Sequence, residues 1–189
     1  MFTIPENVKL SLSQNRKTQI YCQKTMKKLV AFPLIVFSAF LSVFADNSMK
    51  ASDFSLKDQY GKTYYIKFPR EKVTILAFGD RDGSEQLESW IRPLYEKYKD
   101  AIDIYGIAEL SSVPAIARGL VRSIIKAKSP YPVMLDWEGT VSRSYKYEKG
   151  KANIYVIDKK GSVTAKKIGL ANQKELESLF KEIDKALNK

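Results

Sequence analysis

The sequence of 189 residues contains no histidine and only one cysteine, Cys22. Ser-His-Asp catalysis and metal sites built from histidine or cysteine therefore lack the side chains that they need. If Cys22 is removed with an N-terminal leader, disulfide exchange and thiolate-based peroxide reduction are excluded as well. The sequence also lacks internal repeats, low-complexity tracts and a lysine-rich arm, so we expect no nucleic-acid partner.

A secretory signal is predicted near the N-terminus. Met26 is followed by two lysines and then by an apolar run from Leu29 to about Phe44. Val43 and Ala45 stand at the small-residue positions of a signal-peptidase site, so we expect cleavage after Ala45 and a periplasmic or secreted protein. The apolar run is shorter than the roughly twenty residues that a membrane span needs. An uncleaved signal that anchors the chain is the alternative.

The rest of the chain is divided around this signal at residues 26–45. Residues 1–25 are interpreted as the result of a start codon assigned too early, with Met26 as the true first residue, or as a disordered leader. Residues 46–52 are a short linker, and residues 53–189 are predicted to form one domain. The content of 44% hydrophobic and 28% charged residues is that of an ordinary soluble globular protein. From Asp46 onward 26 lysines and arginines stand against 20 aspartates and glutamates, a net charge of +6, which suits either an anionic surface or a solvated basic one.

Within the domain the hydrophobic pattern predicts a mixed α/β fold. Apolar or alternating stretches indicate strands, and apolar residues at spacings of three and four indicate helices. Strands are expected at 63–68, 73–78, 102–110, 154–157 and 162–168, and a short strand or extended segment at 131–137. Helices are expected at about 85–98, at 113–127, for one or two turns after 139, and at 172–187. In this order the helices must cover both faces of a partly parallel sheet.

The first predicted helix follows the heptapeptide GDRDGSE, which ends at Glu85. Ser84 or Asp82 is expected to cap this helix, because Asp82 followed three residues later by Glu85 fits a capping box. Asp80, Asp82 and Glu85 could also offer oxygen ligands to a hard cation. Glycine, however, is the fourth residue of DRDGSE, where a calcium loop has it sixth, so no metal is expected. The buried stripe of the helix should be Leu87, Trp90, Ile91, Leu94, Tyr95 and Tyr98.

The second predicted helix, at 113–127, is amphipathic. Its apolar side, expected to face the core, consists of Ile116, Leu120, Val121, Ile124 and Ile125. Arg118, Arg122 and Lys126 are spaced by four and form a basic stripe on another side. The stripe is interpreted either as a solvated face or as a docking surface for an acidic protein or an anionic lipid surface, because arginine grips carboxylate and phosphate groups.

Three segments together resemble the thioredoxin-like superfamily, specifically its redoxin branch of alkyl hydroperoxide reductase and thiol-specific antioxidant proteins. They read DFSLKDQYGKTY at 53–64, ILAFGDRDGSEQLESWIRPLYEKYKD at 75–100, and ANIYVIDKKGSV at 152–163. The resemblance implies a thioredoxin-like α/β fold, with a central mixed sheet of about five strands flanked by about four helices. The chain is most similar to periplasmic thioredoxin-like proteins of the YtfJ type, which also lack the redox pair.

The chain departs from the family's enzymes at two points of the site that the resemblance implies. The first cysteine of those enzymes belongs in the window 80–86, where this chain has no thiol, so the degenerate site comprises Asp80, Arg81, Asp82, Gly83 and Ser84. Their cis-proline corresponds to Ala152 in this chain. A cis bond before a non-proline residue costs about 2.5 to 4 kcal/mol, so we expect a trans bond before Ala152.

Other candidate groups are weaker. Ser84 cannot act as a nucleophile without a positioned base, and the chain has no histidine. Tyr145 and Tyr147 could face a ligand, although packing is the favoured role. No catalytic residue and no cofactor are therefore expected.

These observations predict a secreted or periplasmic thioredoxin-fold protein without thiol redox activity. It is expected to bind another protein, either at the altered site or on the basic stripe. One alternative is a redoxin-type oxidoreductase or antioxidant, which the family resemblance implies and which would require a thiol. The other is a peripheral membrane-surface module that uses Arg118, Arg122 and Lys126.

Overall fold

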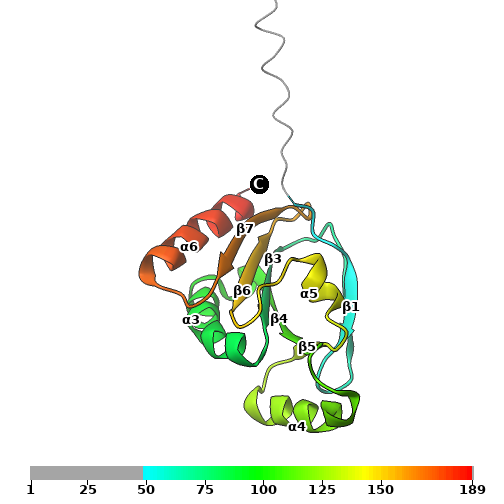
Figure 1. Ribbon diagram of the computed structural model, residues 1–189. Helices are drawn as coiled ribbons and strands as arrows, with labels where there is room; N and C mark the ends of the chain where they lie inside the picture. The colour runs from blue at the N-terminus through cyan, green and yellow to red at the C-terminus, as the bar shows by residue number, and fades with distance from the viewer. Residues whose placement is uncertain (1–48, 189) are drawn as a thin grey trace, which may run out of the picture. The chain divides into compact units, whose positions relative to one another are not determined.

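The computed structural model describes residues 49–188 (Figure 1). The predicted leader at 1–25 with Cys22, and the predicted signal at 26–45 with its cleavage point Ala45, lie outside the described residues and stay predictions. Among the helices of residues 49–188, none is both long enough and apolar enough to cross a membrane.

A five-stranded mixed sheet forms the centre of the domain, in the strand order β5-β4-β3-β6-β7. The strands are β3 (Val73–Gly79), β4 (Ile102–Glu109), β5 (Val133–Asp136), β6 (Asn153–Ile157) and β7 (Val163–Ile168). β3 pairs in parallel with β4, and β4 with β5, whereas β6 runs antiparallel to both β3 and β7. Every residue of β3 is buried, which explains why its sequence is a continuous apolar run rather than an alternating one. The predicted α/β fold with a five-stranded mixed sheet is confirmed.

Two long helices cover one face of this sheet, α3 (Arg81–Tyr98) and α6 (Gln173–Leu187). Trp90, Leu94 and Leu179 are fully buried between these helices and the sheet. The Trp90 indole N–H donates to the Gly169 carbonyl at 2.7 Å, so the largest buried side chain has its polar atom satisfied. Tyr95 is the one member of the predicted α3 stripe that is exposed, at 64%.

The other face is covered by strands and a short helix. An antiparallel pair, β1 (Phe54–Lys57) and β2 (Thr63–Ile66), forms its own two-stranded sheet, and α5 (Thr140–Ser144) lies beside it (Figure 1). The sequence pattern predicts β2 but not β1. Beneath them Phe78, Tyr145 and Tyr155 form an aromatic cluster with ring centroids 5.4 to 5.5 Å apart.

The helix α4 (Arg118–Lys128), preceded by one 3-10 turn (Ala115–Ala117), covers neither face and contains no buried residue. Ile116, Leu120 and Ile124, predicted to face the core, are 97%, 67% and 45% exposed. The prediction is wrong because the β1–β2 pair already occupies the face of the sheet that lies opposite α3 and α6. The turn between β1 and β2 reaches the edge strand β5 through a bridge between Asp58 and Met134.

Candidate functional site

Three acidic residues mark one edge of the central sheet. The parallel strands β3, β4 and β5 end at this edge, and the acids there are Asp80, directly after β3, Glu109 at the end of β4, and Asp136 at the end of β5. In open α/β sheets, ligands bind in the crevice outside the carboxyl ends of the strands. The degenerate site predicted at residues 80–84 lies at this edge, so it forms part of the candidate functional site.

Asp80 is the N-cap of α3, and it holds two segments together. One of its carboxylate oxygens accepts from the Gly83 amide at 2.9 Å, and the other accepts from the Gly150 amide at 2.7 Å. The helix therefore begins at Arg81, and the predictions of a start near Glu85 and of a cap at Ser84 or Asp82 are wrong. An extended backbone at Asp80 turns directly into the helix, so no loop separates β3 from α3.

The remaining residues of the degenerate site form the first turn of α3. Arg81, Asp82 and Ser84 are exposed, whereas Gly83 is buried. The Ser84 hydroxyl donates to the Arg81 carbonyl at 2.8 Å. Within residues 49–188 there is no group of three acidic, histidine or cysteine side chains placed to hold a metal ion.

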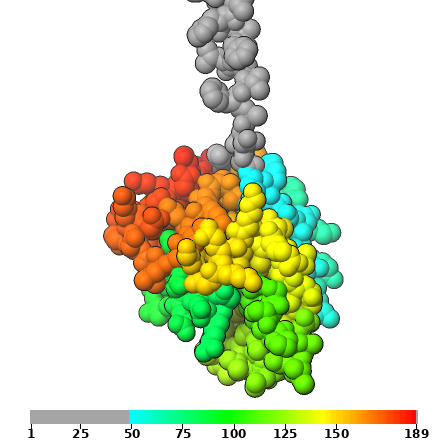
Figure 2. Space-filling model, in the orientation of Figure 1, coloured from blue at the N-terminus to red at the C-terminus, as the bar shows by residue number. Residues whose placement is uncertain are grey.

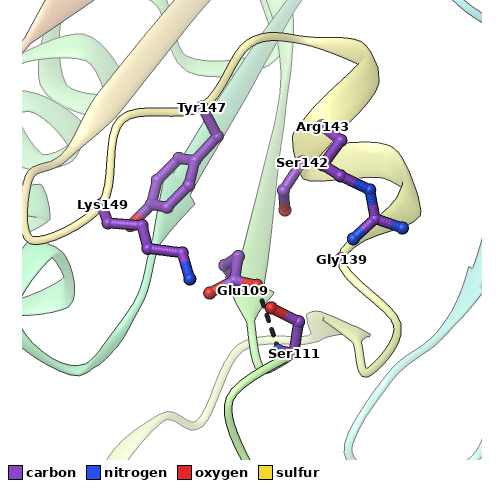
Figure 3. Close-up of a pocket in the computed structure, with 7 residues that line it drawn as sticks. All are labelled: Glu109, Ser111, Gly139, Ser142, Arg143, Tyr147 and Lys149. Atoms are coloured by element: carbon purple, nitrogen blue, oxygen red, sulfur yellow. Dashed lines mark hydrogen bonds between the residues drawn. The ribbon is translucent and has the colours of Figure 1, made fainter.

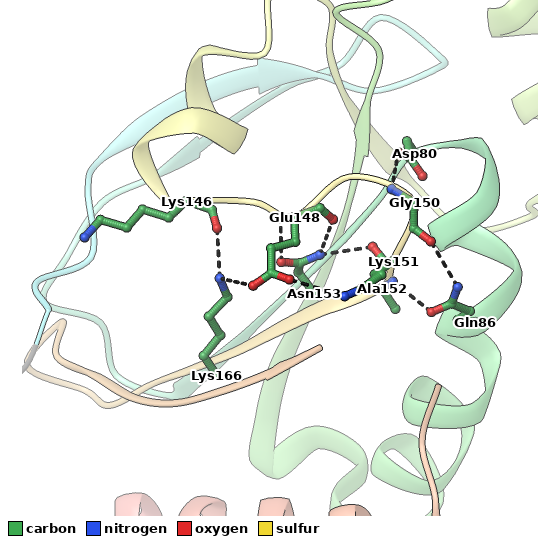
Figure 4. Close-up of polar contacts among 9 residues, drawn as sticks. All are labelled: Asp80, Gln86, Lys146, Glu148, Gly150, Lys151, Ala152, Asn153 and Lys166. Atoms are coloured by element: carbon green, nitrogen blue, oxygen red, sulfur yellow. Dashed lines mark hydrogen bonds and ion pairs between the residues drawn. The ribbon is translucent and has the colours of Figure 1, made fainter. Parts of the chain in front are cut away.

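The buried face of this first turn packs against the segment 150–152. A methyl group built on Gly83 would stand 2.6 Å from the Lys151 carbonyl carbon, so the two backbones touch. The Gln86 side chain joins them further, since its amide donates to the Gly150 carbonyl and accepts from the Ala152 amide, both at 3.2 Å. Figure 4 shows Asp80 and Gln86 holding this segment from one side. Ala152, predicted to belong to the site, is thus buried against the start of α3.

Asn153 fixes the other side of the same loop (Figure 4). Its side chain is fully buried, donates to the carbonyls of Glu148 and Lys151 at 2.9 and 3.0 Å, and accepts from the Glu148 amide at 3.0 Å. Lys166 of β7 donates to the Lys146 carbonyl at 2.8 Å. The loop 146–153 is therefore held in one conformation by side chains of α3, β6 and β7.

Among the described residues the only cis peptide bond is Phe68–Pro69, so the bond before Ala152 is trans, as expected.

A small polar pocket opens beside this loop, with a volume of about 130 Å³. Figure 3 shows its lining residues, which are Glu109, Ser111, Gly139, Ser142, Arg143, Tyr147 and Lys149. Glu109 is only 5% exposed, and one of its oxygens accepts from the Ser111 amide at 3.0 Å. Arg143 and Lys149 are exposed at the rim, and Arg143 donates to the Glu138 carbonyl at 2.9 Å. One buried carboxylate thus faces two cations, in a pocket that suits a charged or zwitterionic group rather than an apolar one.

Tyr147 connects the pocket to the degenerate site. Its hydroxyl accepts from the Asp80 amide at 2.8 Å, and its ring lines the pocket. Burial raises the pKa of Tyr147 well above its ordinary value, which favours the neutral phenol. Tyr145, by contrast, is buried in the core, where desolvation raises its pKa to about 12. Of the two tyrosines considered for a ligand role, only Tyr147 reaches a pocket.

Sequence reasoning missed Glu109, Arg143 and Lys149. Glu109 carried one signal, an acidic residue at the end of a largely apolar strand. Arg143 and Lys149 carried none, because they belong to α5 and to the irregular loop after it, whose position depends on tertiary contacts.

The predicted partner-binding residues lie on α4, outside this pocket, and they are not equivalent. Arg118 is half-buried, pairs with Glu138 at 2.9 Å, and stacks on the Trp137 ring at 5.4 Å from its centroid. Arg122 and Lys126 are exposed. Arg118 therefore anchors α4 to the loop after β5, and only Arg122 and Lys126 are fully available to a partner.

The architecture and the edge described above define a thioredoxin-like α/β domain with no thiol among residues 49–188. Residues 48–166 match the model of the AhpC/TSA family, which is more than half of the chain, and the protein belongs to this family. A comparison with curated proteins found no match. The predicted closeness to YtfJ-type proteins stays a prediction.

Solved structures with the same fold include a thiol:disulfide interchange protein and a thioredoxin by name. A putative thiol:disulfide interchange protein DsbE from Chlorobium tepidum is 22% identical with a TM-score of 0.57, over 75% of this chain and 98% of that one. The exposed lipoprotein thioredoxin Etrx1 of Streptococcus pneumoniae is 20% identical with a TM-score of 0.57, over 69% and 99%. StoA from Bacillus subtilis is 21% identical with a TM-score of 0.53, over 70% and 96%. At these identities the likeness shows the fold.

Proposed function

We propose that this protein is an exported thioredoxin-fold domain that has no thiol redox activity and binds another protein at the carboxyl edge of its sheet. The observation that carries the proposal is the state of the degenerate site. Asp80, Gly83 and Gln86 stand in the window of the family's first cysteine, and all three hold the loop 150–152 in place. A site whose backbone is fixed by hydrogen bonds but that offers no nucleophile is suited to binding a partner rather than to catalysing a reaction.

Export is supported by the signal expected at 26–45. It is also supported by the name of one structural relative, an exposed lipoprotein thioredoxin. Intact mass of the protein from its producer's envelope fraction should give a chain that begins at Asp46. A mass that includes residues 26–45 would mean an uncleaved anchor.

The pocket with Glu109, Arg143 and Lys149 is the proposed contact point. Ligand and cofactor sites usually measure about 300 to 1,000 Å³, so about 130 Å³ has room for a side chain or a chain terminus but not for a cofactor. Arg143 and Lys149 would grip a carboxylate of the partner, while Glu109 would accept from a nearby amide or amine. The fixed loop lowers the entropy cost of binding, because its residues need not be ordered at that moment.

The absence of redox activity can be tested on the full chain with one matched variant. The wild type and Cys22→Ala should both match the buffer control in insulin-disulfide reduction and in peroxide consumption. Activity in the wild type that disappears in Cys22→Ala would instead support the alternative, a redoxin-type oxidoreductase as the family membership implies.

Binding at the pocket can be tested by photo-crosslinking in the producing cell. A photoreactive amino acid in place of Lys149 should give a discrete adduct with another protein, and Arg143→Glu in the same chain should abolish it. The matched control carries the photoreactive group in place of Lys181, an exposed residue of α6. Equal adducts at both positions, or an adduct insensitive to Arg143→Glu, would contradict the proposed contact point.

A further inference from the structure

We propose that α4 binds the surface of an anionic lipid bilayer, with its exposed apolar residues inserted among the lipids and its cations at the headgroups. This inference does not depend on the pocket or on the absence of redox activity. It begins from the failure of α4 to pack on the sheet. Figure 2 shows the helix at the surface of the domain.

The first observation is a row of exposed apolar side chains. Leu120 and Ile124 are spaced by four and lie along one side of α4, Ile116 stands four residues earlier in the 3-10 turn that leads into the helix, and all three are exposed. Scattered exposed apolar residues are ordinary, but a contiguous row on an amphipathic element marks an interaction surface. Val121 and Ile125, which are half-buried, hold the other side of the helix to the domain.

The second observation is the charge of the segment that contains α4. Between residues 110 and 135 the chain has four cations, Arg118, Arg122, Lys126 and Lys128, and no acidic residue. Within residues 49–188 only Arg118 of these four pairs with a carboxylate. A basic flank beside an apolar row is the arrangement of helices that lie in the interface of anionic membranes.

The third observation is a pair of exposed tyrosines beside the C-terminal half of α4. Tyr60 and Tyr131 are 55% and 73% exposed. Lys126 lies 5.5 Å from the centroid of the Tyr60 ring, so this ring lies beside the helix. Tyr131 follows the last residue of α4 by three positions, and its backbone carbonyl accepts from the Gln59 side chain at 2.8 Å. Tyrosine is enriched at membrane interfaces, because its ring is apolar and its hydroxyl stays hydrated.

These features favour a lipid surface over a protein groove. The exposed side of a helix such as α4 is convex, and neither the pocket at Glu109 nor the hollow lined by Arg70 and Asp103 includes a residue of it. A lipid surface supplies distributed negative charge for Arg122, Lys126 and Lys128, and it accepts apolar side chains of any shape. A second copy of this chain would instead bring like charges of the same segment together.

The experiment places an environment-sensitive fluorophore on α4 in the full chain, so that the readout is local and does not report the apolar run at 29–44. In a Cys22→Ala background, Leu120→Cys carries a nitrobenzoxadiazole label, and Lys181→Cys on α6 carries the same label as the matched control. With phosphatidylglycerol vesicles the label at position 120 should shift to the blue and gain intensity, while the label at 181 should not change. Phosphatidylcholine vesicles should give a much smaller shift at 120.

The charge reversals Arg122→Glu and Lys126→Glu test the role of the cations. Each cation near an anionic surface strengthens binding by about fivefold, so the double reversal should weaken the partition at position 120 by about 25-fold or more. Added salt should weaken it as well.

Four results of the vesicle experiments would overturn the proposal. They are no shift at position 120, an equal shift at 181, equal shifts with both lipids, and a partition unchanged by the double reversal. A shift that grows with protein concentration without vesicles would assign the face to a second copy. A shift with polyglutamate but not with vesicles would assign it to an acidic protein. Both would reject a lipid surface, and neither bears on the adduct expected at Lys149.

Discussion

The packing of Gly83 against the loop 150–152 makes a strong prediction for the variant Gly83→Ala. In an ordinary helix this change stabilises the fold by up to about 1 kcal/mol, because alanine has the higher helix propensity. Here the new methyl group would meet backbone atoms of Lys151, the nearest carbon at 2.6 Å, and backbone cannot rotate away as a side chain can. The segment must move.

The cost of that movement follows from the hydrogen bonds that hold the segment. Overpacking of a tight contact costs about 1 to 3 kcal/mol. Displacing the loop also weakens two bonds from Gln86, each worth about 1 kcal/mol, and the charge-assisted bond from the Gly150 amide to Asp80, worth about 2 kcal/mol. Since the loop relaxes only in part and the propensity term opposes the loss, we expect Gly83→Ala to lower the free energy of unfolding by about 3 kcal/mol.

The assay is urea denaturation of the full chain, followed by tryptophan fluorescence and circular dichroism. Gly119→Ala is the matched control, because it changes the same residue type in a helix but has no neighbouring atom within 4 Å of the added methyl group. Gly119→Ala should raise the free energy of unfolding by up to about 1 kcal/mol. If Gly83→Ala proved as stable as the wild type, the close contact between α3 and the loop would be refuted.

Three further predictions rest on single contacts. Asp80→Ala should lower the free energy of unfolding by about 2 to 4 kcal/mol, because it removes the cap of α3 and the tie to the loop. Asp80→Asn, which keeps a capping oxygen, should lose about half as much in the same urea titration, and equal losses would contradict the capping role. Trp90→Phe should cost about 2 to 3 kcal/mol, since it leaves the half-buried Gly169 carbonyl without its donor and removes part of a fully buried side chain; an unchanged denaturation midpoint would count against that bond. The hydrogen bond from Tyr98 lowers the pKa of Asp184 below its ordinary value of 3.8. The bond to the ionised carboxylate therefore contributes to the free energy of unfolding above pH 3.8, and this contribution is lost as the pH falls through the lowered pKa. The stability difference between the wild type and Tyr98→Phe should therefore narrow between about pH 5 and pH 2, and a constant difference would refute the coupling.

Local patterns in the sequence predicted most of the fold. The continuous apolar run of β3, the hairpin of β6 and β7, and the final helix capped by Asn172 follow from periodicity and turn chemistry, which act over a few residues. The predicted cap of α3 was wrong because several acids and a serine stand close together at 80–85. Each of them is able to cap a helix, and only the position of the strand before them selects Asp80.

The candidate site could be predicted only in part. The window 80–84 and Ala152 were identified from the resemblance, and the structure brings them together at the start of α3. The pocket residues Glu109, Arg143 and Lys149 come from three separate segments. No short-range pattern relates such segments, because their meeting depends on the order of the strands in the sheet.

The sequence by itself determined what chemistry is missing, since no fold can supply a histidine, or a thiol between residues 23 and 189, where the chain has none. It also determined the type of each main element, because hydrophobic periodicity is a local property. Only the tertiary structure decided which apolar faces are buried. The pattern of α4 is that of a packed helix, yet the β1–β2 pair covers the face that the helix would have taken, and Ile116, Leu120 and Ile124 stay in solvent. Burial depends on which element reaches a face of the sheet, and that competition cannot be read from the helix alone.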